Sequence, residues 1–256
     1  MSAVPEGVQV HRAADRFRTS TGWLDSAHSF SFGRHYDPAN TSFGVLLASN
    51  DDVVAPGSGF ATHPHRDVEV VTWVLRGSLV HRDSEGNSGV VVPGLAQRMS
   101  AGRGILHSER NDAAADDPRR SPEAVHLVQM WVAPDQVGLE PSYEQREVDL
   151  LAGGLVPVAS GRPGHDAAVR IHNRHAALHA ARLAPGQTVQ LPEAPYLHLF
   201  VAVGGVELEG VGLLGTGDAV RCTAPGGRRM TGREPAEVLV WEMHAGQAVG
   251  ARDGRV

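Results

Sequence analysis

Two pairs of side chains in this sequence could bind a metal ion. His63 and His65 form one pair at i, i+2 spacing, and His107 and Glu109 form the other about forty residues later. Alternate residues of a β-strand point to the same face, so each pair would direct two donors into the same space. If the two strands meet inside a β-barrel, three imidazoles and one carboxylate converge on one metal ion.

This donor set restricts the metal and leaves room for a ligand. Imidazole nitrogen and carboxylate oxygen suit iron, manganese, nickel, copper or zinc. Cys222 is the only cysteine, so the chain can form neither a thiolate cluster nor an intrachain disulfide. A site with four protein ligands keeps coordination positions open. The sequence therefore predicts one divalent transition metal that a small molecule can reach.

The elements that must position these pairs are expected to be short strands. The segment 68–92 is rich in β-branched residues and is divided by Arg76-Gly77 and by the turn sequence SEGNSG, which indicates an antiparallel meander. Further strands are predicted at 23–32, at 43–48 and in EAVHLVQMWVAP. The polar and basic segment 8–18 precedes the first predicted strand.

Length and composition favour a chain of one large or two ordinary domains. It has 256 residues, of which 41% are hydrophobic and 20% charged, and its 30 glycines and 16 prolines punctuate the sequence often. Strand-like runs resume after residue 169, beyond a segment with few periodic features. We predict an all-β chain with two domains, over residues 1–150 and 151–256.

Charge and hydropathy exclude some functional classes. The formal net charge of -6 argues against direct nucleic-acid binding, which needs concentrated lysine and arginine. No apolar run approaches the length of a transmembrane helix, so no membrane partner is expected. The N-terminal sequence lacks the apolar core of a signal peptide, which favours a cytoplasmic location.

Five of the six phenylalanines precede the first histidine pair. Buried aromatic residues usually fill a core, and that is one reading of this cluster. The other reading is an apolar ligand pocket near the metal. The sequence leaves both open for the set Phe17, Phe30, Phe32, Phe43 and Phe60.

Four long segments of the sequence carry a resemblance to a known family. They are GWLDSAHSFSFG, VVAPGSGFATHPHRDVEVVTWVLRGSLVHRDSEGNSG, QRMSAGRGILHSE and VHLVQMWVAPDQVGLEPSYEQ. From about Arg12 to Gln145 the sequence resembles the pirin family, a group of bicupins within the cupin superfamily, and the form HPHRD most resembles the bacterial quercetin 2,3-dioxygenase-like pirins. The resemblance implies two jelly-roll (cupin) barrels in tandem, with the metal in the first.

The choice of carboxylate ligand lies between Glu69 and Glu109. Glu69 completes the general first cupin motif, and its even offset from His65 would keep it on the same strand face if no bulge intervened. In pirin-like chains, however, the ligand is the carboxylate after the second-motif histidine, which is Glu109 here. The resemblance therefore implies Glu109 as ligand and leaves Glu69 as a group that supports the ligands or as a structural charge.

The remaining histidines are interpreted without a metal. His172, His175 and His179 are read as scattered surface residues, and His198 has no partner at i+2, so the second unit is expected to be a degenerate cupin without metal ligands. His81 and His126 lie on predicted strands and could orient ligands or fill space.

Two functions of different class follow from the resemblance. One is a dioxygenase of quercetin 2,3-dioxygenase type that opens a flavonol or related phenol with O2, with Fe(II) as the first-choice metal, Mn, Ni, Cu or Zn as alternatives, and Glu109 as the catalytic base. The other is a non-catalytic, redox-sensitive metal-binding module that docks a regulatory protein partner. The residues alone do not separate them, because one barrel supports many chemistries.

Overall fold

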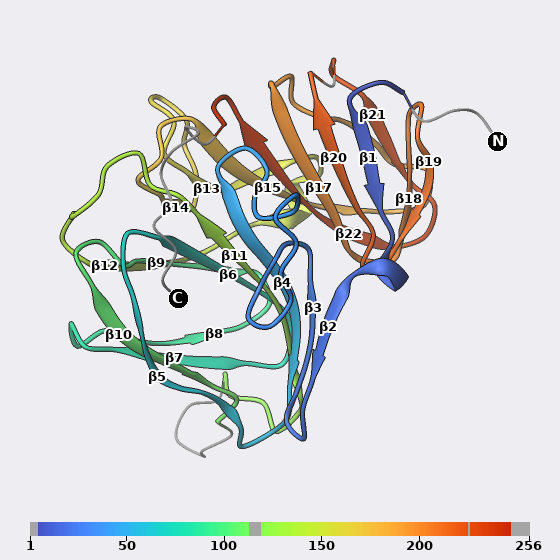
Figure 1. Ribbon diagram of the computed structural model, residues 1–256. Coiled ribbons are helices and arrows are strands. Elements are labelled where there is room, and N and C mark those ends of the chain that lie inside the picture. The colour runs from blue at the N-terminus through green and yellow to red at the C-terminus, as the bar shows by residue number, and fades with distance from the viewer. Residues whose placement is uncertain (1–4, 113–118, 225, 247–256) are drawn as a thin grey trace.

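The structure is a computed structural model that describes residues 5–112, 119–224 and 226–246 (Figure 1). Within these residues the chain consists of strands, loops and two short 3₁₀ helices, η1 (Ala13–Asp15) and η2 (Leu150–Ala152). The strands form two β-barrels, which confirms the predicted all-β class. No helix among the described residues is both long and apolar enough to cross a membrane.

The first barrel is built from a seven-stranded and a four-stranded sheet. In hydrogen-bonded order the larger sheet contains β12 (Ser142–Glu147), β9 (Leu95–Ser100), β6 (Glu69–Arg76), β11 (Val125–Val132), β4 (Leu46–Val54), β3 (Leu24–His28) and β2 (Phe17–Ser20). The smaller contains β5 (Gly59–His65), β10 (Ile105–Arg110), β7 (Leu79–Asp83) and β8 (Ser88–Val91).

The strand order corrects the expected meander. The β7–β8 hairpin is present as predicted, with Leu79 opposite Val91. However, β6 pairs with β9 and β11, and the link at Arg76-Gly77 carries the chain from the larger sheet to the smaller one. Strands that are distant in sequence thus lie side by side in both sheets of the barrel, as in a jelly roll.

The second barrel repeats this plan. Its seven-stranded sheet contains β1 (Val8–His11), β20 (Ala219–Thr223), β17 (Tyr196–Val203), β22 (Ala236–Met243), β15 (Ala176–Leu183), β13 (Val156–Ser160) and β14 (Val169–Arg170). Its four-stranded sheet contains β16 (Thr188–Gln190), β21 (Arg229–Gly232), β18 (Gly205–Leu208) and β19 (Gly212–Gly215).

The N-terminal strand β1 hydrogen-bonds in the sheet of the second barrel. Val8 lies opposite Cys222 and Val10 opposite Val220, and both valines pack on the second core. In Figure 1 this blue strand runs among the orange strands of that barrel. The sequence places the start of the first strand at residue 23, whereas the first strand of the structure begins at Val8. Only the short Val8–Val10 alternation signals it, since its partner lies more than two hundred residues away.

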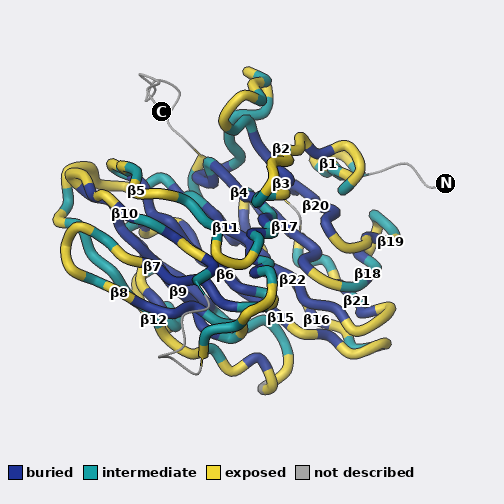
Figure 2. The backbone as a smooth tube through the Cα atoms, turned by 90° about the horizontal axis from the view of Figure 1, so that it is seen from below, coloured by how far each residue is buried: buried dark blue, intermediate teal, exposed yellow. Residues whose placement is uncertain are grey.

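The two barrels share a hydrophobic core between their larger sheets. Trp73 and Met130 from the first barrel pack with Phe200 and Trp241 from the second, all of them fully buried. Figure 2 shows the buried strands of both barrels at the centre of the molecule. Burying apolar surface contributes a free energy of roughly 25 cal/mol per Å². Such a shared core therefore links the two domains strongly.

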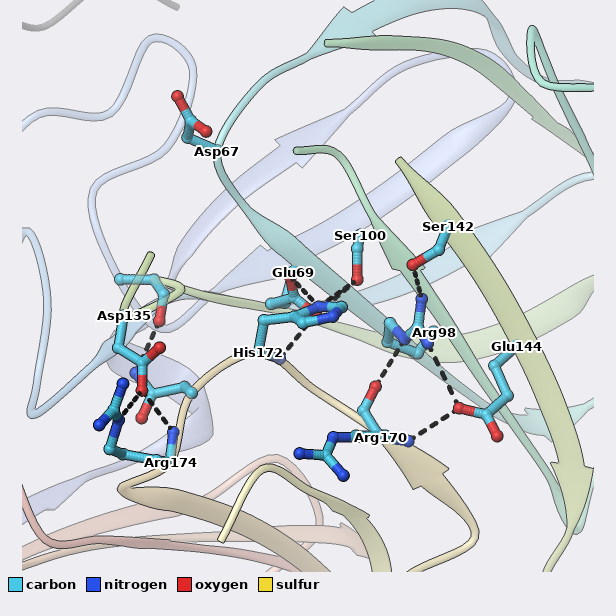
Figure 3. Close-up of polar contacts among 12 residues, drawn as sticks. Asp67, Glu69, Arg98, Ser100, Asp135, Ser142, Glu144, Arg170, His172 and Arg174 are labelled. Carbon is cyan, nitrogen blue, oxygen red and sulfur yellow. Dashed lines mark hydrogen bonds and ion pairs between the residues drawn. The ribbon is translucent and has the colours of Figure 1, made fainter. Parts of the chain in front are cut away.

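Polar contacts at the edge of this core also join the barrels (Figure 3). The buried Glu69 carboxylate accepts hydrogen bonds from Ser100 Oγ at 2.7 Å and from the backbone N–H of His172 at 3.2 Å. Arg98 Nε donates to the carbonyl oxygen of Arg170 at 2.7 Å. The segment 170–172 of the second barrel is thereby tied to β6 and β9 of the first.

Candidate metal centre

The first histidine pair and the second lie on neighbouring antiparallel strands of the smaller sheet. His63 on β5 lies directly opposite His107 on β10. The Nε2 atoms of these two residues are 3.0 Å apart, and the ring of His65 lies 4.8 Å from that of His107 between centroids. One nitrogen from each of the three rings falls within 4.8 Å of the others. The alternation rule thus places the three imidazoles as predicted.

Local hydrogen bonds fix the tautomer of His63. Its Nδ1 lies 2.7 Å from the carbonyl oxygen of Ala61, so Nδ1 carries the proton and donates it. In the neutral ring Nε2 then holds a lone pair, and it is Nε2 that faces His107. Metal-binding histidines commonly make such a hydrogen bond through their other ring nitrogen, because it fixes the orientation of the ring.

A buried His81–Asp83 pair performs the same task for His107. Asp83 accepts hydrogen bonds from its neighbours and lies 3.3 Å from His81 Nε2, so that nitrogen donates. His81 Nδ1 is then an acceptor, and it lies 3.5 Å from His107 Nδ1. His107 donates through Nδ1 and keeps the lone pair of Nε2 for the site. His81, which the sequence left open, therefore acts as an orienting residue in this geometry.

The surroundings keep two of these rings neutral. Burial, with the nearby His107 and His63 as further causes, lowers the pKa of His65 to about 4. Burial and the neighbouring His63 and His81 lower the pKa of His107 to about 3. An imidazole must be unprotonated to bind a metal, so the site has both rings in the competent form at neutral pH.

Glu109 is buried two residues beyond His107 on β10. A β-bulge between His107 and Glu109 shifts the register against β5, and the carboxylate groups closely with His107 and His81 rather than with all three rings. Gln129 Nε2 donates to Glu109 Oε2 at 2.8 Å. The other oxygen, Oε1, is buried without a hydrogen-bond partner. One carboxylate oxygen is therefore held and the other is available.

The donor atoms fit a transition-metal dication. The Nε2 atoms of His63 and His107 face each other as acceptors, a contact that repels unless something positive lies between them. His65 Nε2 and Glu109 Oε1 are also buried and unpartnered. Leaving such groups unsatisfied costs about 1–3 kcal/mol each. A dication bound to the three imidazoles would satisfy their nitrogens at once, and the unpartnered Oε1 of Glu109, which lies close to His107, is the carboxylate oxygen available to join them.

The phenylalanine cluster divides between the two readings. Phe30 is buried and Phe43 packs beside it in the core shared by the barrels. Phe60 instead lies 6.4 Å from the His63 ring, and Phe32 packs on Trp131, which in turn contacts His65 at 4.8 Å between centroids. Some of these aromatic side chains therefore border the candidate metal centre, while others stabilise the fold.

Glu69 does not join the site. His65 ends β5 in the smaller sheet, whereas Glu69 begins β6 in the larger one, so the two are not on one strand face as the offset argument assumed. Glu69 faces the second barrel and binds Ser100 and His172 (Figure 3). It is a structural charge. His126 likewise contacts Asp51 at 2.6 Å and none of the candidate ligands.

The reading of three C-terminal histidines as surface residues is wrong for His179, which is buried with its Nε2 3.0 Å from Glu242. His172 is partly exposed and contacts Glu69, and His175 is exposed as expected. The error arises because Glu242 lies far from His179 in sequence. Gln129 was missed for the same reason, although a glutamine inside an apolar strand is a signal that could have marked it.

Comparison with known proteins places this fold and site in context. Residues 8–132 match the pirin family, and residues 158–243 match the quercetinase C-terminal cupin domain. A Mycobacterium tuberculosis protein, whose name assigns it provisionally to quercetin 2,3-dioxygenase, is 62% identical over 93% of this chain and 96% of its own. The chain belongs to the pirin family. The resemblance read from the motifs is thus confirmed.

Other pirin-related proteins agree with this placement. The quercetin 2,3-dioxygenase of Escherichia coli K12 is 38% identical over 80% of this chain and 85% of its own. The crystal structure of YhhW from Escherichia coli has a TM-score of 0.83 and 34% identity, covering 94% of this chain and 99% of that one. Bacterial pirin YhhW has also been crystallised in complex with nickel(II), at a TM-score of 0.81. The two cupin domains expected from the sequence are therefore confirmed.

Proposed function

We propose that this pirin is a metal-dependent dioxygenase of quercetin 2,3-dioxygenase type, acting with O2 on flavonols or related phenols. The observation that supports the proposal is the convergence of three imidazole nitrogens near a buried carboxylate oxygen that has no hydrogen-bond partner. The names of the relatives support the reaction. The proposed site lies in the first barrel, within residues 1–150.

The proposed ligands are His63, His65, His107 and Glu109. We take Fe(II) as the first candidate and Ni, Mn, Cu or Zn as alternatives, since this mixed nitrogen and oxygen set accommodates each of them. A bound dication would supply Lewis acidity toward a phenolate oxygen and redox access to O2. His63 and His65 are half-buried whereas His107 is buried, so the site is reached from the β5 side.

Glu109 is the proposed proton acceptor for the phenol hydroxyl. Its Oε1 atom is unpartnered, while Oε2 is held by Gln129 at 2.8 Å. Trp131 Nε1 donates to Gln129 Oε1 at 3.1 Å, which turns the amide nitrogen of Gln129 toward the carboxylate. Gln129 and Trp131 thus position Glu109 so that one oxygen can accept a proton.

The overall reaction opens the central ring of the flavonol. Both atoms of O2 enter the product, two carbon–carbon bonds break, and one carbon leaves as carbon monoxide. Glu109 Oε1 would accept the phenol proton by giving up its place as a metal ligand, while Gln129 holds Oε2, and the proton would return to the carboxyl group of the ring-opened product. Phe60 and Trp131 border the histidines and offer apolar surface to a flat aromatic substrate.

The test measures flavonol turnover by the full-length protein. Apoprotein is reconstituted separately with each first-row divalent metal and mixed with quercetin in air, while flavonol absorbance and carbon monoxide are followed. We expect turnover with at least one metal, and a loss of about 10²–10⁴ in kcat for Glu109→Gln at retained fold.

The control is Glu85→Gln, which changes an exposed carboxylate in the turn after β7 and should leave turnover unchanged. Absence of turnover with every metal would overturn the dioxygenase proposal and favour the redox-sensitive regulatory module. Full activity of Glu109→Gln would overturn the assignment of the base while leaving the reaction class standing.

A further inference from the structure

A second group of metal-type donors lies in the C-terminal barrel. It consists of His165, His179 and Glu242, which each place one donor atom within 4.8 Å of the other two. His179 comes from β15, Glu242 from β22 and His165 from the loop between β13 and β14. The sequence predicts no ligands in this barrel, because His198 has no partner at i+2, and no two residues of this group have that spacing.

The position of the group follows from strand alternation and pairing. His179 lies opposite Val240, so Glu242 is its diagonal neighbour two residues further along β22. Val238 and Val240 precede Glu242, and Val240, which shares its strand face, packs in the core of the second barrel. The donors therefore sit at one end of that core, with Arg162 and His244 at the outer edge, where their side chains are 30% and 33% exposed.

The hydrogen bonds of Glu242 leave one donor of the group without a partner. Glu242 Oε1 contacts Arg162 Nη1 and lies 2.7 Å from His244 Nε2, while Oε2 lies 3.0 Å from His179 Nε2. His165 Nδ1 is buried and has no hydrogen-bond partner. An ion-pair network explains the positions of Arg162, His179, Glu242 and His244. It does not explain why the Nδ1 atom of His165 is buried.

Charge and protonation suit a cation here. Burial acts to raise the pKa of Glu242, but hydrogen bonds from His179 and His244 and the charge of Arg162 together bring it down to about 2. Burial, with His179 and Arg162, lowers the pKa of His165. Both shifts favour the forms in which such groups bind a metal, an ionised carboxylate and a neutral imidazole.

We propose that His165, His179 and Glu242 form a second binding site for a divalent first-row transition metal, with Glu242 as a monodentate ligand through Oε2. Two imidazoles and one carboxylate are a common transition-metal set and leave positions for water. Arg162 and His244 remain on Oε1 and orient the carboxylate from outside, as hydrogen-bonded neighbours of metal ligands do. The ion replaces the proton that His179 Nε2 shares with Oε2.

The experiment counts Zn²⁺ ions bound to full-length apoprotein by calorimetric titration and by elemental analysis after dialysis. The wild-type chain should bind two equivalents. His63→Ala, which disables the first barrel, should retain one equivalent, and His63→Ala combined with His165→Ala should retain none. The count does not depend on catalysis, so its result and that of the flavonol assay are separable.

His165→Ala is the decisive single variant, because it removes the unpartnered nitrogen and leaves the contacts of Glu242 intact. It should weaken the second equivalent at least tenfold, whereas the matched control His175→Ala, an exposed histidine nearby, should leave both equivalents unchanged. A purely structural ion-pair network predicts no change in His165→Ala. That result, or the loss of all Zn²⁺ in His63→Ala alone, would overturn the proposal.

Discussion

At the scale of single residues, three of the four candidate ligands of the first barrel are held by a hydrogen bond with a neighbouring group. The Ala61 carbonyl holds His63, the His81–Asp83 pair holds His107, and Gln129 holds Glu109. The approach of the three imidazoles could be predicted from strand alternation because alternation is local, whereas the choice of Glu109 over Glu69 depended on the family resemblance. The contact between Gln129 and Glu109 could not be predicted, because it depends on how β11 packs across the barrel.

Asp52 gives a prediction about pH at this scale. It is buried on β4 and accepts a hydrogen bond from Ser26. Burial raises its pKa to about 7, with the charges of Asp51 and Glu109 as further causes, despite the hydrogen bond from Ser26. The folded state thus binds more protons than the unfolded state between about pH 4 and pH 7, so stability should fall as pH rises through that window.

Asp52→Asn removes this ionisation and keeps an oxygen for Ser26 to bind. We expect the variant to gain unfolding free energy relative to wild-type apoprotein at pH 8, with about 4 kcal/mol as the upper bound for a shift of this size, and to gain less at pH 5. Denaturant unfolding at both pH values measures it. Asp25→Asn, at a half-exposed surface pair with Arg18, is the control. An equal difference at both pH values would contradict the account.

At the scale of elements, the centre depends on the close approach of β5 and β10. Gly59 opens β5 with φ +155°, and a Cβ atom there would lie 2.2 Å from the carbonyl oxygen of Glu109. Because the Cβ atom would clash with backbone, which cannot rotate away, Gly59→Ala must push the two strands apart. His63 and His107 would move apart with them. We expect at least a tenfold loss of metal affinity, measured by calorimetric titration.

Gly57→Ala is the matched control for the strand separation. Gly57 also has a positive φ, at +72°, but a Cβ atom there meets nothing within 4 Å. That variant should lose about 1 kcal/mol of stability from backbone strain and keep its metal affinity. Equal affinities for the two variants would show that the metal centre does not depend on this strand contact.

Strand existence was more predictable than strand pairing. The β7–β8 hairpin follows from the local turn sequence, whereas the order of the larger sheets depends on contacts between distant segments. The misreading of Glu69 shows this most clearly. Its spacing from His65 matches a cupin motif, but the chain changes sheets between them, so the carboxylate faces the second barrel. Spacing along the sequence cannot reveal such a change.

At the scale of the whole molecule, the Glu69 contacts and the shared core couple the two barrels (Figure 3). Glu69→Ala would leave the Ser100 hydroxyl and the His172 N–H without their acceptor. Each such loss costs about 1–3 kcal/mol. We expect the free energy of unfolding to fall by an amount of this order. Because the two barrels would be less strongly coupled, the single thermal transition should separate into two, as measured by calorimetry.

The metal content of Glu69→Ala should stay at the wild-type value, because Glu69 does not face the centre. Glu140→Ala serves as control, since it removes an exposed pair with Arg103 that contributes well under 1 kcal/mol. A drop in metal content at unchanged stability would instead make Glu69 a ligand and contradict the interface role.

The most direct test of the central claim is anomalous X-ray diffraction from crystals of the zinc-loaded protein, recorded on both sides of the zinc absorption edge. The account predicts a peak in the first barrel at about 2.0–2.2 Å from Nε2 of His63, His65 and His107 and from Oε1 of Glu109. Density of zinc elsewhere with these nitrogens unbound, or coordination by His81 in place of Glu109, would contradict it.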